Sequence, residues 1–185
     1  QYAHLSMILG DDGQKLSKRH GAVSVTQYDD DGYLPEAVIN YLARLGWSHG
    51  DEELFSLDQM VAWFDGSHLS KSPAQWDAAK LTWVNAHYIK QADDARLAGL
   101  VAAQLAGRGL AVAADDRLAA MCALFKDRCN TTVDLADWLQ MYFAPVTPTA
   151  EDLSAHLTDA VRPALVSLRD RLAACPWDKA GIAQA

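Results

Sequence analysis

A short cationic segment is the part of this sequence best suited to chemistry. Lys15 and Lys18 lie three residues apart, Arg19 follows directly, and Ser17 adds a hydroxyl group. Lysine carries a compact, mobile charge that can follow phosphate oxygens. In phosphoryl or nucleotidyl transfer negative charge shifts during the reaction, so cations delivered at that moment stabilise the transition state more than the ground state. The segment therefore suits a loop that handles phosphate groups.

The same residues have a simpler interpretation, which the segment alone leaves open. A basic stretch of this length is usually a solvated turn or a nonspecific anion patch. The G-x-x-x-x-G-K-[ST] spacing of a P-loop is absent. Glycines that let the chain bend and approach a ligand closely flank the segment on both sides. They are Gly10, Gly13 and Gly21.

Length and composition limit the class of protein. The chain has 185 residues, 50% hydrophobic and 22% charged, which is enough apolar material for one domain or two small ones. No apolar run reaches the roughly 18–20 residues of a membrane-spanning helix. Three cysteines fit a reducing compartment, and neither they nor the acidic residues have the spacing of a metal site. The net charge of −8 argues against nucleic acid on average, although a local cationic segment can override that average.

The sequence predicts a mainly α-helical protein that begins with a short strand. Residues 4–9 predict that strand, and the Gly-Asp-Asp-Gly stretch after it predicts a turn. Pro35 suits the first turn of a helix, Ser56 begins a capping box, and Asp77 is a helix cap. Further helices are expected over residues 94–107, 115–128, 132–143, 159–174 and from 178 onward.

A polar, turn-rich stretch around residues 48–55 predicts a domain boundary. Residues 1–50 contain one strand and a loop, too little for an independent α/β domain, and are expected to be the tail of something larger. Residues 51–185 are expected to form a helical region.

Several motifs together resemble bacterial-type glutamyl-tRNA synthetases, a family of class I aminoacyl-tRNA synthetases. The strand (HLSMIL), the Asp-Gly turn and residues 15–21 (KLSKRHG) are similar to the family's "KMSKS" region. The likeness continues in residues 32–37 (GYLPEA), 40–42 (NYL), 45–48 (LGWS) and 72–74 (SPA), and in Asp77, Lys80, Leu81, Trp83, Asn85 and Tyr88.

The resemblance implies a reaction and a division of labour. The family activates L-glutamate with ATP and transfers it to the terminal adenosine of tRNA(Glu), in a Rossmann-like domain that precedes the loop and carries a "HIGH" motif. No His-x-Gly-His pattern occurs in this chain. We therefore expect a C-terminal portion of such a protein, lacking the catalytic Rossmann domain, shortened at its C-terminal end, and inactive by itself.

The resemblance also assigns roles to residues. Lys18 and Lys15 would be the catalytic lysines, and Lys15, Leu16, Ser17, Lys18 and Arg19 would bind ATP, which comes with Mg²⁺ in the full-length enzyme; no bound cofactor is expected here. In the helical anticodon-binding part, Lys126 and Arg128 would take phosphates and Asn130 would take a base edge, with Lys71 and Lys80 as further phosphate candidates. The implied protein is a cytoplasmic monomer that binds tRNA(Glu) and no membrane.

Two other interpretations remain open at this point. The first is a helical protein–protein interaction module whose basic loop is incidental, which the acidic net charge favours. The second is a relative of glutaminyl-tRNA synthetases, whose loop is similar. That family's anticodon region consists largely of β-barrels, so β-structure after residue 35 would favour it.

Overall fold

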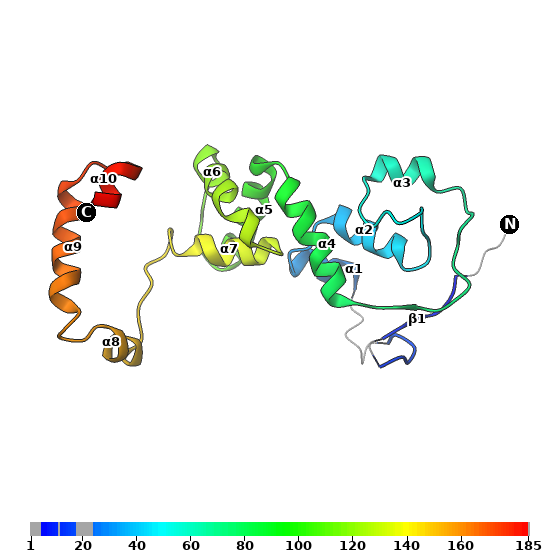
Figure 1. The fold of residues 1–185 in the computed structure, drawn as a ribbon, viewed down its shortest axis with the longest axis horizontal. Coiled ribbons are helices and arrows are strands. Elements are labelled where there is room, and N and C mark those ends of the chain that lie inside the picture. The colour runs from blue at the N-terminus through cyan, green and yellow to red at the C-terminus, as the bar shows by residue number, and fades with distance from the viewer. Residues whose placement is uncertain (1–4, 11, 18–23, 185) are drawn as a thin grey trace. The chain divides into compact units, whose positions relative to one another are not determined.

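The structure is a computed structural model that describes residues 5–10, 12–17 and 24–184. The chain forms two compact units, residues 1–144 and residues 145–185, which are described separately here. Figure 1 shows that helices make up nearly all of the regular structure. The predicted mainly α-helical class is confirmed.

The first unit begins with a two-stranded parallel sheet. Strand β1 (Ile8–Leu9) pairs with β2 (Ala74–Gln75), and Ile8 lies opposite Ala74. The predicted strand over residues 4–9 is confirmed only at its end, and His4 lies outside the described residues. Strand β2 has no signal in the sequence, because two residues are too few to show an alternating pattern. These two strands are the only β-ladder among the described residues, so the β-barrel expected of a glutaminyl-type relative is absent from them.

The first unit also contains four helices before residue 92, and local capping signals start three of them. They are α1 (Val25–Asp30), α2 (Pro35–Arg44), α3 (Leu57–Trp63) and α4 (Ala78–Gln91). Pro35 opens α2, Ser56 and Gln59 form the predicted capping box of α3, and the Asp77 carboxylate accepts a hydrogen bond from the backbone N–H of Lys80. Helix α2 packs against α4. Their shared core consists of Leu34, Ala37, Val84 and Ile89.

A three-helix bundle completes the first unit. It contains α5 (Asp94–Gly107), α6 (Asp116–Phe125) and α7 (Thr132–Gln140), and a short 3-10 segment (Lys126–Arg128) follows α6. Asp93, Asp115 and Thr131 cap these helices with their side chains. The predicted helices are confirmed, although the last turn of the 115–128 helix tightens into 3-10 geometry and the 132–143 helix ends at Gln140. In Figure 1, α4 lies between α2 and this bundle.

The second unit contains three helices with no buried core of their own. They are α8 (Ala150–His156), α9 (Arg162–Ala174) and α10 (Lys179–Gln184), and none of their residues is buried. Helix α8 was not expected from the sequence, although Thr149 and Asp152 form a capping box that marks its start. None of the described helices is both long enough and apolar enough to cross a membrane.

Gly32 is the point at which the turn before α2 touches the start of α7. Its φ of +82° lies in the left-handed region, and its carbonyl accepts a hydrogen bond of 3.0 Å from the Thr132 N–H. A Cβ at this position would lie 2.7 Å from the backbone nitrogen of Val133. The backbone angle and the close approach therefore both require glycine.

A matched pair of glycine substitutions separates these two requirements. Gly109 has almost the same φ, +81°, but open space where a Cβ would go. We expect Gly109→Ala to lower the free energy of unfolding by about 1 kcal/mol, and Gly32→Ala to lower it by about 1–3 kcal/mol more, because the added carbon overpacks the contact. Chemical denaturation followed by circular dichroism measures both, and equal losses would contradict the contact with α7.

Candidate functional site

The basic segment begins on a short hairpin that follows β1. Lys15 forms an antiparallel bridge with Leu9, and the Leu16 N–H donates to the Ile8 carbonyl at 2.9 Å. The Lys15 side chain is exposed, whereas Leu16 and Ser17 are half-buried. Lys18 and Arg19, the other predicted phosphate ligands, lie outside the described residues. The strand thus fixes the backbone at Lys15 and leaves its ammonium group open to a ligand.

Trp76 contacts residues both before and after the basic segment, a role that was not expected from the sequence. The backbone N–H of Trp76 donates to the Leu9 carbonyl at 2.8 Å, where the hairpin leaves β1. Its ring lies 6.0 Å from that of Tyr28, in the helix after the segment, and 5.0 Å from that of Tyr41. The Tyr41 hydroxyl in turn accepts a hydrogen bond of 2.7 Å from the Asp77 N–H. Only the folded chain brings these residues together.

Lys80 and Lys71 are the further phosphate candidates, and only Lys80 forms an ion pair with a described residue. Lys80 forms an ion pair with Glu53 and lies 4.0 Å from the centre of the Trp83 ring. The hydrogen bond from Lys80 lowers the pKa of the Glu53 carboxyl. Lys71 is exposed in the turn before β2, and no described residue forms an ion pair with it.

Lys126 is tied into the protein rather than presented to solvent. Its Nζ lies 2.7 Å from Oδ1 of Asp94 and donates to the Ala92 carbonyl at 3.0 Å. Only 18% of its side chain is exposed. Lys126 therefore fastens the 3-10 segment to the connection between α4 and α5.

Arg128 and Asn130 are exposed and line one hollow of about 410 Å³ at the start of α7. Trp138 and Met141 contribute apolar surface to the same hollow. Trp138 is 41% exposed, and its ring is stacked on the Phe125 ring with 5.8 Å between the centroids and 28° between the planes. A cation, an amide and an aromatic face thus meet at one place. The sequence predicted the first two residues, but not that an aromatic ring from the next helix joins them.

The two acidic residues that line this hollow are engaged elsewhere. The Asp134 carboxylate caps α7, accepting hydrogen bonds from the backbone N–H groups of Asn130 (2.9 Å) and Thr131 (3.0 Å). Asp137 forms an ion pair of 2.6 Å with Arg108. Arg128 has no ion pair with a described residue, so its charge is available to an anion.

A buried amide fixes the backbone at this hollow. The Asn85 side chain is fully buried in α4, where its Oδ1 accepts from the Leu34 N–H at 2.8 Å. Its Nδ2 donates to the Asn130 carbonyl at 2.5 Å. One side chain therefore ties the turn before α2 to the turn before α7. The signal in the sequence is a polar residue on the buried face of an amphipathic helix, next to Leu81 and Val84.

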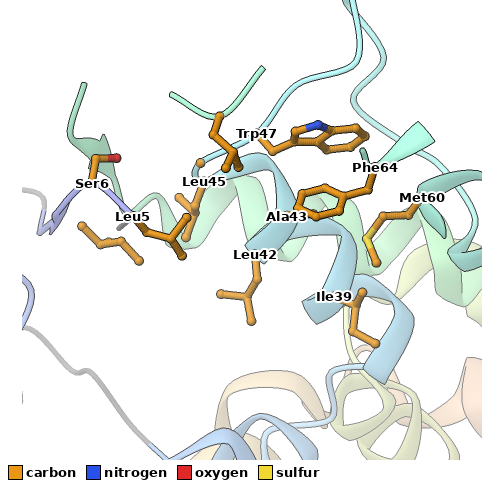
Figure 2. A pocket seen from close by; sticks show the side chains of 12 residues that line it. Leu5, Ser6, Ile39, Leu42, Ala43, Leu45, Trp47, Met60 and Phe64 are labelled. Atoms are coloured by element: carbon orange, nitrogen blue, oxygen red, sulfur yellow. The ribbon is translucent and has the colours of Figure 1, made fainter. Parts of the chain in front are cut away.

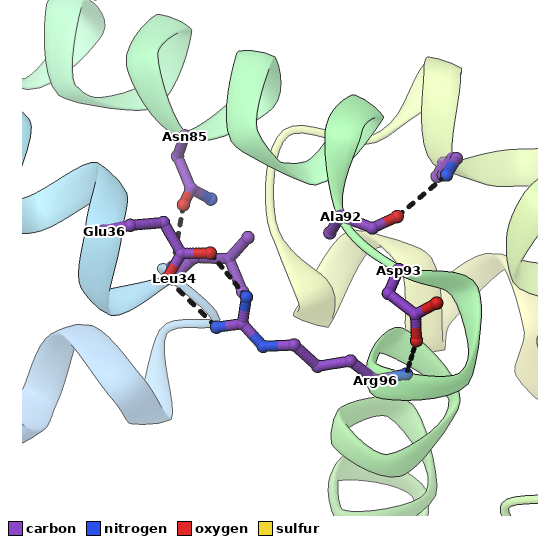
Figure 3. A network of polar contacts seen from close by, with 7 residues as sticks. Leu34, Glu36, Asn85, Ala92, Asp93 and Arg96 are labelled. Atoms are coloured by element: carbon purple, nitrogen blue, oxygen red, sulfur yellow. Dashed lines mark hydrogen bonds and ion pairs between the residues drawn. The ribbon is translucent and has the colours of Figure 1, made fainter. Parts of the chain in front are cut away.

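An ion pair crosses the same junction near its surface. Figure 3 shows the Arg96 guanidinium of α5 facing the Glu36 carboxylate of α2, with distances of 2.5 Å and 3.0 Å between paired atoms. The hydrogen bonds from Arg96 lower the pKa of the Glu36 carboxyl. Because Arg96 is 45% exposed, solvent limits this pair to about 1 kcal/mol at most.

The remaining titratable groups give no sign of metal chemistry. In the part of the chain that the structure describes, no group of three or more His, Cys, Asp or Glu side chains could hold a metal ion. Cys122 and Cys129 are buried in the bundle core, and burial raises the pKa of each thiol to about 11. Both are packing residues.

Two family models match the sequence and cover different parts of it. Residues 1–83 match "tRNA synthetases class I (E and Q), catalytic domain", and residues 95–185 match "Anticodon binding domain". The basic segment lies in the first match, and the hollow at Arg128 lies in the second. Helix α4 spans most of the interval between the two.

Curated relatives and a solved structure agree with these matches. The chain is 62% identical over 182 residues to a glutamate–tRNA ligase of Leptothrix cholodnii, covering 98% of this chain and 39% of that protein. It is 61% identical over 184 residues to that of Aromatoleum aromaticum, covering 40% of it. A crystal structure of a glutamate tRNA ligase from Elizabethkingia meningosepticum, in complex with its amino acid, superposes with a TM-score of 0.80 at 27% identity. That match covers 98% of this chain and 40% of that one. The chain thus spans about two fifths of the length of these relatives.

Removal of the Asn85 amide tests whether this side chain holds the turn before α2 against the turn before α7. We expect Asn85→Ala to lower the free energy of unfolding by about 2–4 kcal/mol, since it leaves the buried Leu34 N–H and the part-buried Asn130 carbonyl without this partner, at about 1–3 kcal/mol each. Gln91→Ala removes an exposed amide from the same helix and should stay within about 0.5 kcal/mol of the unchanged chain. Urea denaturation measures both, and a loss of the same size in both variants would disprove the role of Asn85.

Proposed function

We propose that this chain, which belongs to the glutamate–tRNA ligase family of class I tRNA synthetases, binds tRNA(Glu) and contributes phosphate contacts to its charging. The reaction converts ATP, L-glutamate and tRNA(Glu) into glutamyl-tRNA(Glu), AMP and pyrophosphate. The chain carries the end of the family's catalytic domain and an anticodon-binding domain. The activity and the partners of the whole protein are part of the proposal.

The observation that carries the proposal is the hollow at the start of α7. Proteins recognise unpaired RNA bases by stacking them on aromatic rings and by hydrogen bonds to their edges, and they hold the backbone through cations. Trp138, Asn130 and Arg128 supply these three functions at one hollow, within the residues that match an anticodon-binding domain. The charge of Arg128 is local, so it can act despite the net charge of −8.

The other predicted RNA ligands fall into two groups. Lys71 is exposed and unpaired among the described residues, and we assign it a backbone phosphate. Lys126 and Lys80 would have to leave Asp94 and Glu53 to reach RNA. Their contribution is therefore smaller than that of Arg128, and they act first by supporting the fold.

We assign the basic segment to the phosphates of ATP. Lys15 and Lys18 would carry the catalytic charges, and Leu16, Ser17 and Arg19 would shape the loop around the ATP phosphates and their Mg²⁺. The support is the exposed Lys15 ammonium on a strand-anchored hairpin, within the residues that match the catalytic domain. The three cysteines are free thiols, in accord with the cytoplasmic location that we propose, and we propose a monomer.

Arg128 and the anticodon provide the direct test. We expect the chain to bind glutamate tRNA in a salt-dependent way and to bind an anticodon-swapped copy more weakly. Arg128→Ala should weaken binding to the cognate tRNA about tenfold, near 1.4 kcal/mol, and reduce the difference between the two tRNAs. Fluorescence anisotropy across a salt series measures each affinity.

Lys90→Ala is the matched control, because it removes one exposed positive charge from α4, away from the hollow. It should change affinity less than threefold. Equal binding of both tRNAs would reduce the proposal to generic phosphate contact. Absence of binding at low salt would contradict it and favour the protein-interaction module.

The chain by itself should not activate glutamate. We expect no glutamate-dependent exchange of pyrophosphate into ATP above background, since we place the ATP and glutamate pockets mostly in the part of the ligase that precedes the "KMSKS" region. The full-length ligase of Leptothrix cholodnii serves as the positive control in the same assay. Exchange by the pure chain would show that the residues present suffice for catalysis.

A further inference from the structure

An apolar groove lies between the start of the sheet and the helices that follow it. Its volume is about 470 Å³. Figure 2 shows the side chains of Leu5, Leu42, Ile39, Met60 and Phe64 around one open space, with Trp47 at its edge. The groove is thus built from the segment before β1, from α2 and from the region around α3.

The chemistry of the groove is that of a protein core. None of the described residues that line it is charged. Leu5 is 76% exposed, Phe64 50% and Leu42 42%, although each borders an otherwise apolar surface. The Trp47 indole is only 4% exposed, and its Nε1 has no hydrogen-bond partner among the described residues. Exposed apolar patches of this kind mark surfaces that another protein segment covers.

We propose that this groove seats the part of the class I catalytic domain that the relatives have and this chain does not. Every lining residue lies between positions 5 and 69, inside the range that matches the catalytic domain. The chain spans only about 40% of its relatives and matches the end of that domain. A domain has one contiguous core, so the open face of its final portion belongs against the rest of the same domain.

The occupant is therefore an apolar protein surface and not RNA. Nucleic acid requires cations or accessible hydrogen-bond donors at its phosphates. The described lining residues include no cation, and their polar side-chain groups are the single hydroxyl of Ser6 and the buried indole N–H of Trp47. Lys15, the described lysine of the basic segment, lies on the hairpin beyond β1 and does not line the groove. The inference rests on family membership and not on tRNA binding, which concerns a different surface.

Thiol labelling tests the proposal in a long and a short form of the protein. The short form is this chain, with Cys175→Ser to remove its one cysteine that is not buried. The long form joins residue 1 to the portion of the Leptothrix cholodnii ligase that precedes the matched region. Leu42→Cys and Phe64→Cys each place a thiol in the groove, and Leu124→Cys, 74% exposed on α6, is the matched control.

We expect a maleimide to label both groove thiols at least tenfold more slowly in the long form than in the short form. The Leu124→Cys thiol should react at the same rate in both. Equal rates at the groove positions would overturn the proposal. Protection in the short form that rises with concentration, together with a dimer mass by light scattering, would instead assign the groove to a second copy and also overturn it.

A second measurement does not depend on the joined protein. The dye anilinonaphthalene sulfonate should bind the short form, and Leu42→Glu should remove at least half of its fluorescence, whereas Leu124→Glu should not. The full-length Leptothrix cholodnii ligase should give less than half of the signal per molecule. An equal signal from that ligase would overturn the proposal. None of these results changes the tRNA affinity, so the two proposals can fail separately.

Discussion

The buried side-chain amide of Asn85 is the interaction on which the rest of the first unit depends. It accepts from the Leu34 backbone on one side and donates to the Asn130 backbone on the other. Leu34 lies 51 positions before Asn85 in the sequence and Asn130 lies 45 positions after it, yet both contact the same side chain of α4. Because a buried amide that loses one partner leaves another polar group unpaired, the arrangement is enforced rather than merely allowed. The end of the catalytic-domain match and the start of the anticodon-domain match are held together across α4.

The positively charged residues of the first unit fall into two groups, those that form ion pairs within the fold and those that remain available to a ligand. Lys126, Lys80 and Arg96 meet carboxylates across elements that are distant in sequence, and their charges are used in holding the fold. Arg128 is two residues from Lys126, yet it lines a hollow in which both carboxylates already have partners. A difference of two positions in the chain thus separates a structural cation from one available to a ligand. The proposed RNA contact rests on that difference.

Much of the fold could be predicted because its signals are local. The caps at Ser56 and Asp77, the proline that opens α2 and the apolar spacing within α5 act within one or two turns, so the sequence places those helices closely. Two elements that were not predicted lack such apolar spacing. Strand β2 is two residues long and exists through its pairing with β1. Helix α8 is a short helix beside two prolines, with no buried face to produce a hydrophobic period.

The sequence by itself determined the helical class, the basic segment and the resemblance of that segment to the class I tRNA synthetases, because motif spacing and helix caps are properties of neighbouring residues. Only the tertiary structure decided which polar residues are occupied. Whether Lys126 or Arg128 is free, whether Trp138 joins Asn130, and whether Leu42 and Phe64 remain open to a partner all depend on what other elements bring within a few ångströms. Burial and ion pairing are set by contacts between segments distant in sequence, and a residue's type carries no record of them.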